Sequence, residues 1–320
     1  MAAIETYHLT KKFDQTVAVD DLSIQIDRGE VFGFLGPNGA GKTTTIRMLT
    51  SLIGPTSGRA VVNGYTVGEE NRSIRRSVGI LTETPGMYDN LSAEYNLRVY
   101  GNLYEVKDVQ GQVEKYLRLL GLWERRNDEV GTFSKGMKQK LAIARALLHE
   151  PSILFLDEPT AALDPEAARL VRDFIVFLRE EGRTFFLSTH NLNEADRLCD
   201  RIAVFKTQLL VLDTPAKLRS QAFGRKVVFH LRTNDPKYLE AINALHVSSD
   251  VQQVENKIVV TLENPEQNNP FIIQTLVNAG AEIQFVGELR RSLEDVYLQL
   301  VQNTSNDEHH SRSKPNDFVD

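Results

Sequence analysis

The chain has 320 residues, of which 41% are hydrophobic and 25% charged, the balance of an ordinary soluble globular protein with room for two domains. Its formal net charge of −6 argues against a duplex nucleic-acid partner, and its one cysteine, Cys199, excludes an intramolecular disulfide. No apolar run reaches the roughly 18 residues of a membrane span, and the N-terminal stretch lacks a signal-peptide core. We therefore expect a cytosolic chain that reaches a membrane only through a partner.

Short apolar runs alternate with helical patterns over residues 30 to 213. Continuously apolar strands separated by helices are typical of a parallel sheet covered on both faces, so this part predicts an α/β fold. The region from about Ser92 to Gly121 has helical periodicity, and residues 201–213 predict a closing hairpin. The expected strands are 30–36, 77–83, 152–158 and 184–190, and the other expected helices are 41–54, 137–148 and 165–182.

The composition shifts near Ser220, which indicates a second, smaller domain. After a helix that ends at Gly224, the pattern predicts elements in the order β-α-β-β-α-β, the split βαβ or ferredoxin-like plan. A last helix opens with a capping-box pattern from Ser292 to Asp295. The polar tail after Asn303 is expected to be disordered.

The segment "GPNGAGKT" fits the phosphate-loop pattern G-x-x-x-x-G-K-[ST] and lies between a predicted strand and a predicted helix. Glycines let the backbone N–H groups turn toward phosphate oxygens, and the helix that follows directs its positive end at the same anion. The lysine would reach the terminal phosphates, and the threonine after it would bind Mg²⁺. We expect the phosphates of the ligand to be held by Gly36, Pro37, Asn38, Gly39, Ala40, Gly41, Lys42, Thr43 and Thr44.

Two acids end the apolar strand "ILFLDE", and a histidine ends the strand "TFFLSTH". Buried acids are costly unless they bind something, so Asp157 is a candidate Mg²⁺ ligand together with Thr43. Glu158 would polarise the attacking water as the general base. His190 would contact the γ-phosphate and hold that water. The catalytic candidates are therefore Lys42, Glu158 and His190.

With these motifs the chain resembles the nucleotide-binding subunits of ATP-binding cassette (ABC) transporters. "FSKGM" is similar to the family's signature loop, "LDEPTAALDP" to its joined Walker B motif and D-loop, and the likeness runs from Ile4 to about Leu218. It implies a P-loop cassette over residues 1–220, with a RecA-like core, an antiparallel β subdomain and a helical subdomain at about 85–150. A small α+β accessory domain would follow at 225–302, before the tail at 303–320. That domain would join two copies, gate the cycle, or only stabilise the cassette.

The resemblance also implies site residues. Phe13 falls where the family stacks an aromatic ring on adenine, with Tyr7 as a competing candidate. Glu83 stands where the family usually has a glutamine, which leaves its role as a Mg²⁺ ligand open. Lys135 replaces a signature glycine. The resemblance leaves open whether this lysine contacts phosphate or faces solvent. The signature and D-loop residues expected at the nucleotide of an opposite copy are Ser134, Lys135, Gly136 and Asp164.

These features imply an ATPase that uses ATP and Mg²⁺, pairs with a second nucleotide-binding subunit as a homodimer, and lies on the inner face of the cell membrane. Its permeases would be separate chains, docking at Pro85 to Tyr104 with Met87 and Tyr88 as contacts. The signature and the glutamate at 83 indicate an exporter of the antibiotic-resistance type, which would move a drug, an antibiotic or a lipid-like molecule. Two other classes stay open: an ABC ATPase that acts on nucleic acid or ribosomes, and a sensor that binds ATP without turnover.

Overall fold

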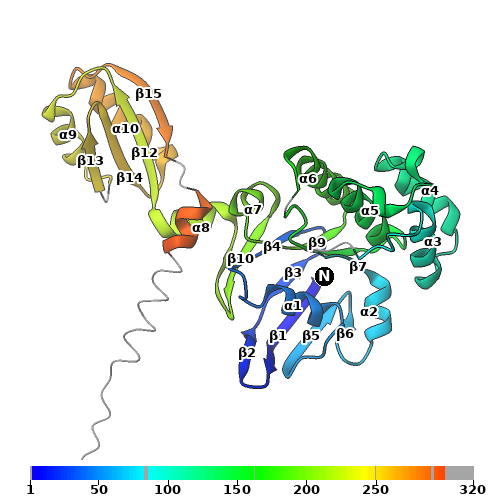
Figure 1. Cartoon of the computed structure of the whole chain (residues 1–320). Coiled ribbons are helices and arrows are strands. Elements are labelled where there is room, and N and C mark those ends of the chain that lie inside the picture. The colour runs from blue at the N-terminus through cyan, green and yellow to red at the C-terminus, as the bar shows by residue number, and fades with distance from the viewer. Residues whose placement is uncertain (1, 83–85, 162, 249, 290–291, 300–320) are drawn as a thin grey trace, which may run out of the picture. The chain divides into compact units, whose positions relative to one another are not determined.

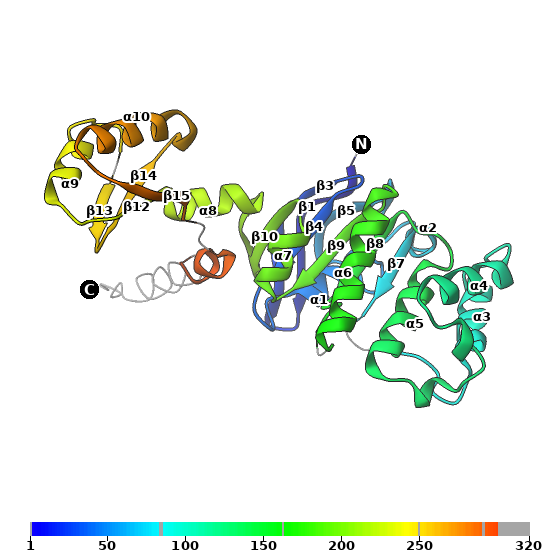
Figure 2. The same ribbon diagram turned by 90° about the horizontal axis from the view of Figure 1, so that it is seen from above.

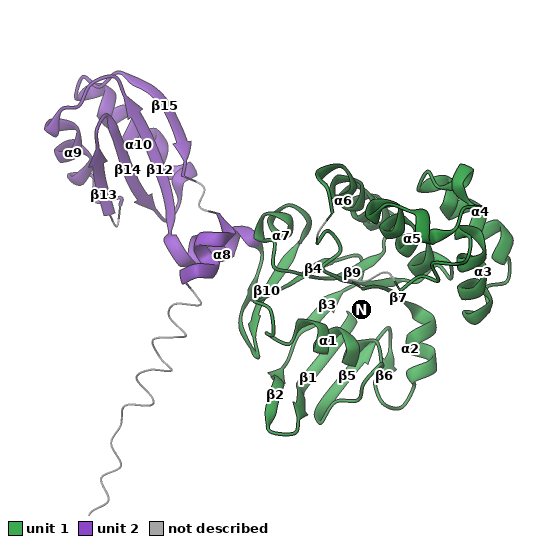
Figure 3. Cartoon of the chain, in the orientation of Figure 1, with its two compact units in different colours: residues 1–214 green, residues 215–320 purple. Residues whose placement is uncertain are grey.

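The computed structural model describes residues 2–82, 86–161, 163–248, 250–289 and 292–299 and divides the chain into two compact units, residues 1–214 and 215–320 (Figure 3). The sequence placed the boundary at 220–225. The structure places it before helix α8 (Pro215–Phe223), because this helix contacts strand β12 of the second unit. The predicted tail from residue 303 lies outside the described residues.

A six-stranded sheet forms the centre of the first unit, in the order β11-β10-β4-β9-β8-β7 (Figure 1). The strands from β10 to β7 pair in parallel, and β11 closes the sheet as an antiparallel hairpin with β10, as the sequence predicts. The strands are β4 (Val31–Leu35), β7 (Val78–Leu81), β8 (Ile153–Asp157), β9 (Thr184–Thr189), β10 (Arg201–Lys206) and β11 (Gln208–Asp213).

A second, antiparallel sheet has the order β2-β1-β5-β6, with β3 paired to β1. Helix α1 (Lys42–Leu49) contacts strands of both sheets and buries Ile46, Met48 and Leu49 in the core that they share. The strands are β1 (Ala2–Phe13), β2 (Thr16–Leu22), β3 (Gln25–Asp27), β5 (Ser57–Val62) and β6 (Tyr65–Thr66).

The helices from α3 to α7 cover the opposite face of the central sheet or extend beyond its β7 edge (Figures 1 and 2), whereas α2 contacts β6 and β7 and adds Ile74 to the core that the two sheets share. The sequence predicts helical periodicity throughout residues 92–121, but the structure has two helices there, packed on each other and on α5. The chain turns at Glu105, which has a φ of 56°, and Asp108 starts the next helix by accepting a hydrogen bond from the Gly111 amide. The helices are α2 (Asn71–Ser77), α3 (Ala93–Leu103), α4 (Val109–Leu119), α5 (Lys135–Leu147), α6 (Pro165–Glu180) and α7 (Leu192–Leu198), with short 3₁₀ turns at Trp123–Arg125 and Val130–Thr132.

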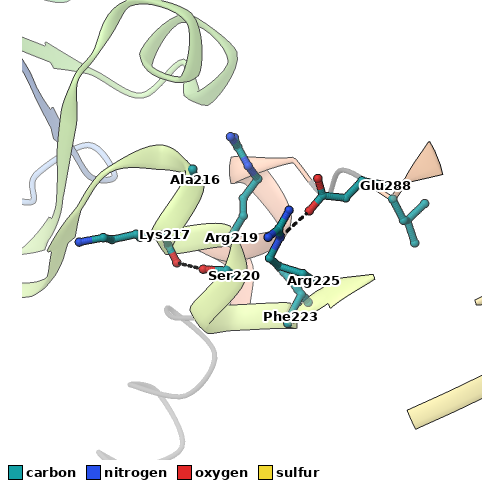
Figure 4. A pocket seen from close by; sticks show the side chains of 9 residues that line it. Ala216, Lys217, Arg219, Ser220, Phe223, Arg225 and Glu288 are labelled. Carbon is teal, nitrogen blue, oxygen red and sulfur yellow. Dashed lines mark hydrogen bonds and ion pairs between the residues drawn. The ribbon is translucent and has the colours of Figure 1, made fainter. Parts of the chain in front are cut away.

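The second unit has a four-stranded antiparallel sheet in the order β13-β14-β12-β15, with its core formed together with α9 and α10. This strand order and the element order β-α-β-β-α-β match the predicted ferredoxin-like plan. Arg225 donates hydrogen bonds to Glu288 (Figure 4) and, in a bidentate pair, to Glu266. The elements are β12 (Arg225–Leu231), α9 (Pro236–Asn243), β13 (Asp250–Val254), β14 (Lys257–Leu262), α10 (Pro265–Asn278) and β15 (Ile283–Glu288).

A further helical segment at 293–299 begins at the predicted capping box. The backbone amide of Asp295 donates to Oγ of Ser292, and the amide of Ser292 donates to the Asp295 carboxylate. Within the part of the chain that the structure describes, none of the helices has the length and apolar character needed to cross a bilayer.

Candidate functional site

The phosphate loop joins the end of β4 to the start of α1. A Cβ atom on Gly36 would lie 2.2 Å from the carbonyl oxygen of Phe205, and one on Gly41 would lie 2.2 Å from that of Ala18. Gly41 also has a φ of 104°, where side chains are strained. Both positions therefore require glycine, and the loop is held between β10 and β2. The hollow beside the loop is lined by Ala18, by the run from Pro37 to Thr44, and by Asp157 and Glu158.

Lys42 is buried at this hollow, with 6% of its surface exposed. Its Nζ donates to the carbonyl oxygens of Gly36 at 2.7 Å and Pro37 at 3.3 Å, and it lies 3.4 Å from Oε1 of Glu158. A buried ammonium needs such acceptors, and they fix its position. The cation is thus held where the terminal phosphates of a nucleotide in the loop would lie.

Thr43 and Asp157 come together as the sequence predicts for a divalent cation site. The Thr43 hydroxyl donates to Oδ2 of Asp157 at 2.9 Å, and the Ser188 hydroxyl donates to Oδ1 of the same carboxylate. A hydroxyl and a carboxylate next to a phosphate site are the hard oxygen ligands that Mg²⁺ prefers. The donor set therefore fits this ion. The third predicted ligand, Glu83, lies outside the described residues.

Glu158 and His190 are brought together by the parallel pairing of β8 with β9. Oε2 of Glu158 is 2.8 Å from Nδ1 of His190 and accepts a longer hydrogen bond, at 3.4 Å, from the His190 backbone amide. The Glu158 backbone has a φ of 50°, a region that non-glycine residues seldom adopt. Its own amide donates to the carbonyl oxygen of Ser188, so the neighbouring strand holds this conformation. The carboxylate is thereby fixed between Lys42 and His190.

The segments that the sequence predicts as signature loop and D-loop line a different hollow. Ser134 is the N-cap of α5 and accepts from the Met137 amide at 3.2 Å, and Asp164 is the N-cap of α6 and accepts from the Ala167 amide at 2.8 Å. Ser134, Gly136 and Asp164 line this second hollow, which shares no described lining residue with the hollow of the phosphate loop. The structure therefore does not bring the predicted γ-phosphate contacts of residues 134–136 to the phosphate loop of the same chain.

Phe13 ends β1 at the hairpin with β2, where it pairs with Thr16. The residue is 47% exposed, and Nζ of Lys11 lies 5.0 Å from the ring centroid. An exposed ring of this kind can take a stacked base on its face. The competing candidate, Tyr7, is also exposed but lies in the middle of β1, where this strand pairs with β5.

The predicted permease-facing segment has an exposed aromatic residue at Tyr88, whose ring stacks with Tyr100 at a centroid distance of 6.4 Å. The side chain of Asn96 binds both backbone groups of Tyr88: its Oδ1 accepts from the Tyr88 amide, and its Nδ2 donates to the Tyr88 carbonyl. Met87 is half-buried beside it. Pro85, at the start of the predicted segment, lies outside the described residues.

Sequence reasoning missed several residues of this site. Ala18 reaches the hollow through β2, about two dozen residues before the lysine of the loop, and its type gives no signal of that contact. Ser188 is a buried polar residue near the end of β9, after the apolar run 185–187 and two residues before His190, and a polar residue at that place was a usable signal. Thr160 and Glu194, described below, are joined only by the tertiary fold.

A phosphate loop between β4 and α1, paired acids at the end of β8 and a histidine after β9 define the first unit as a P-loop ATPase domain. Known families divide the chain similarly: residues 19–161 match the family described as "ABC transporter", and residues 214–301 match "ATP-binding protein DrrA1-3-like, C-terminal domain". The chain belongs to the ATP-binding proteins of ABC transporters, a family that hydrolyses ATP to drive transport.

Full-length relatives support this assignment. The chain is 34% identical over 310 residues to the uncharacterized ABC transporter ATP-binding protein YhcH of Bacillus subtilis (strain 168), covering 96% of this chain and 99% of that protein. It is 34% identical over 309 residues to the bacitracin transport ATP-binding protein BcrA of Bacillus licheniformis, covering 93% of this chain and 97% of that protein.

Solved structures resemble the cassette. One, described as an ATP-binding subunit of an ABC transporter, is 32% identical with a TM-score of 0.63 and covers 68% of this chain and 92% of its own. Another, the dimeric structure of MJ0796, a bacterial ABC transporter cassette, is 25% identical with a TM-score of 0.61 and covers 66% of this chain and 98% of its own.

Proposed function

We propose that two copies of this subunit bind two ATP molecules between them, and that hydrolysis drives an exporter whose permeases are separate chains. The observation that carries this proposal is the separation of the nucleotide site into two hollows. One holds the phosphate loop with Lys42, Asp157 and Glu158, and the other holds the helix start capped by Ser134. A second copy facing the first would complete each site.

The helix start at Ser134 is suited to an anion from another chain. Helix α5 has 13 residues, and its N-terminal amides carry partial positive charge. Facing the phosphate loop of the opposite copy, Ser134, Lys135 and Gly136 would contact its γ-phosphate, with Asp164 beside them. The similar MJ0796 cassette is described as dimeric, which supports this arrangement.

Within each site the chain's own residues divide the chemistry. Lys42 neutralises the terminal phosphates, Glu158 polarises the attacking water, and His190 holds the water and the γ-phosphate in line. Thr43 and Asp157, with Glu83 as a third candidate, would hold Mg²⁺, which supplies charge neutralisation at the phosphate oxygens when bound. Phe13 stacks on the adenine.

The similarity to BcrA, a bacitracin transport protein, supports an export role with a drug, an antibiotic or a lipid-like molecule as cargo. The subunit would lie on the cytoplasmic face of the membrane and touch it only through the permeases. The exposed residues around Tyr88 would receive the permease. Nucleic acid is not among the expected partners.

Mixing two inactive variants tests the shared site. Ser134→Arg disrupts the signature side of the shared site, and Lys42→Ala disrupts its phosphate-loop side. A dimer of either variant alone should therefore contain no complete site. In a mixed dimer, one site combines the intact phosphate loop of the first variant with the intact signature of the second. ATP hydrolysis by the mixture should therefore rise well above that of either variant.

The control for the mixture is Ser134→Arg combined with a chain that carries both substitutions, since no complete site can form in that dimer. If the first mixture is no more active than this control, although the subunits exchange, the shared-site proposal is wrong. Co-purification with the permease chains, followed by transport into inverted vesicles, then tests the export role.

A further inference from the structure

Glu194 is a buried carboxyl group next to the catalytic loops that the proposed chemistry does not use. It lies in the first turn of α7, one turn after His190, and only 2% of its surface is exposed. Its backbone amide donates to Oδ1 of Asn191, the N-cap of α7, and this hydrogen bond fixes the backbone from which the side chain extends. The side chain extends toward the loops that follow β8 and β9.

One oxygen of this carboxylate contacts both the loop after β8 and the last residue of β9. Oε2 of Glu194 accepts from the Thr160 hydroxyl at 2.8 Å and, at a longer 3.4 Å, from the Thr189 hydroxyl. Thr160 lies two residues after Glu158, and Thr189 immediately precedes His190. The direct contact between Glu158 and His190 is therefore accompanied by a second connection between the ends of the same two strands, through Glu194.

Placing a carboxyl group here is costly. Burial raises the pKa of Glu194, while the hydrogen bond from Thr160 and the charge of Arg172 act against that rise and the charge of Glu158 adds to it. The other oxygen, Oε1, is buried and has no hydrogen-bond partner among the residues that the structure describes. An unpaired buried oxygen destabilises the fold, so stability alone does not account for a glutamate at this position.

The loop after Glu158 has a reason to be held. The φ of 50° at Glu158 is a strained conformation for a glutamate and persists only where its surroundings impose it. The Ser188 carbonyl restrains the residue from one side, and the amide of Ala161 donates to the Glu158 carbonyl. The hydrogen bond from Thr160 to Glu194 anchors the same turn to α7.

We propose that Glu194 is a positioning residue for ATP hydrolysis, which sets the place of the Glu158 carboxylate relative to His190 by holding Thr160. This inference rests on the proposed role of Glu158 as the general base. Glu194 touches neither nucleotide nor water in this role. Its loss should therefore lower kcat and leave the KM for ATP unchanged.

Steady-state ATP hydrolysis by the full chain tests this inference. Glu194→Ala removes the acceptor, and kcat should fall on the order of 10- to 100-fold, the range that small misplacements of catalytic groups produce. Glu194→Gln keeps a carbonyl oxygen for Thr160 and should retain most of the activity. Thr160→Val removes the donor at nearly constant volume and should reproduce the loss, without further loss when combined with Glu194→Ala.

Asn193→Ala, at an exposed neighbouring position of α7, is the matched control and should behave as the unmodified chain. The inference is overturned if folded Glu194→Ala keeps full kcat, if KM rises instead, or if the Thr160 and Glu194 losses add independently. Should Glu194→Ala not fold, Thr160→Val decides alone, since full activity in that variant excludes the connection. Glu158→Gln is measured in parallel. If this variant hydrolyses ATP normally, the proposed role of Glu158 as general base is wrong. If Glu158→Gln is inactive and Thr160→Val is fully active, only the role of Glu194 is refuted.

Discussion

Nδ1 of His190 lies 2.8 Å from Oε2 of Glu158, across the parallel pairing of β8 with β9. The carboxylate is largely buried, whereas the imidazole is 61% exposed and open to a ligand. With a proton on Nδ1, the histidine donates to the carboxylate and leaves Nε2 facing outward. This pair is therefore suited to orient a water molecule against a phosphate held by the loop at residues 36–43.

Glu158→Gln should bind ATP and form the ATP-dependent dimer but hydrolyse it about 100- to 10,000-fold more slowly, the range expected for loss of a general base. Phosphate release measures turnover, and size-exclusion chromatography with ATP measures dimerisation. Glu180→Gln, an exposed position of α6, is the control and should be fully active. Normal hydrolysis by Glu158→Gln would show that another group activates the water.

Lys42→Ala should abolish hydrolysis and weaken nucleotide binding. The substitution removes the cation beside the terminal phosphates and leaves the Glu158 carboxylate without its ion pair at 3.4 Å. Phosphate release and titration with a fluorescent ATP analogue measure the two effects. Lys107→Ala, at an exposed position of the helical subdomain, should change neither. Retained hydrolysis in Lys42→Ala would contradict the assignment of the phosphate loop.

Phe13→Ala should weaken ATP binding about threefold to tenfold, because an aromatic stacking contact contributes roughly 0.5–1.5 kcal/mol. Phe13→Tyr keeps a ring at the same place and should bind ATP as the unmodified chain does. Tyr7→Ala separates the two candidates in a single titration. If Tyr7→Ala weakens binding and Phe13→Ala does not, the adenine stacks on Tyr7 instead.

The stability of the first unit should fall as the pH drops below about 6.5, through His149. Burial lowers the pKa of this imidazole below its usual 6.5; its Nε2 contacts the carbonyl of Val78 at 2.9 Å, and its ring stacks on Tyr104. The unfolded chain therefore takes up the proton at a higher pH than the folded chain does. The stabilisation from neutral His149 is fully present above the pKa that this histidine has in the unfolded chain. It is lost as the pH falls toward the lower pKa of His149 in the folded chain.

Urea denaturation at a series of pH values between 5 and 8 checks this prediction. In His149→Asn, the decline in the free energy of unfolding at low pH should be smaller than in the unmodified chain. His246→Asn, which replaces an exposed histidine of the second unit, should leave the decline unchanged. A pH profile that is the same in all three chains would mean that His149 is protonated equally in the folded and unfolded states.

Much of the fold followed from local sequence patterns. The strands around Phe155 and Phe186 are buried along their whole length and apolar at their centres, and such runs between helices favour a buried parallel sheet. The break after α3 was not predicted, because the apolar periodicity continues across it. The turn depends instead on the backbone conformation of Glu105 and on the cap at Asp108.

The site was predictable where it is contiguous in the chain and not where the tertiary fold assembles it. Lys42 and Thr43 follow from their own motif, and Glu158 from its place at the end of an apolar strand. The contact between Thr160 and Glu194 joins residues 34 positions apart. No local pattern reports that pairing, because it depends on how α7 packs against β4 and β9.

Gly136 and Ala167 give the signature loop a mechanical property. A Cβ atom on Gly136 would lie only 3.2 Å from that of Ala167, so the first turns of α5 and α6 are in close contact, two residues after the cap Ser134 and three after the cap Asp164. Two helix starts packed this closely shift together rather than past each other. If a nucleotide bound at Ser134 displaces the start of α5, we expect the start of α6, with Asp164, to move with it.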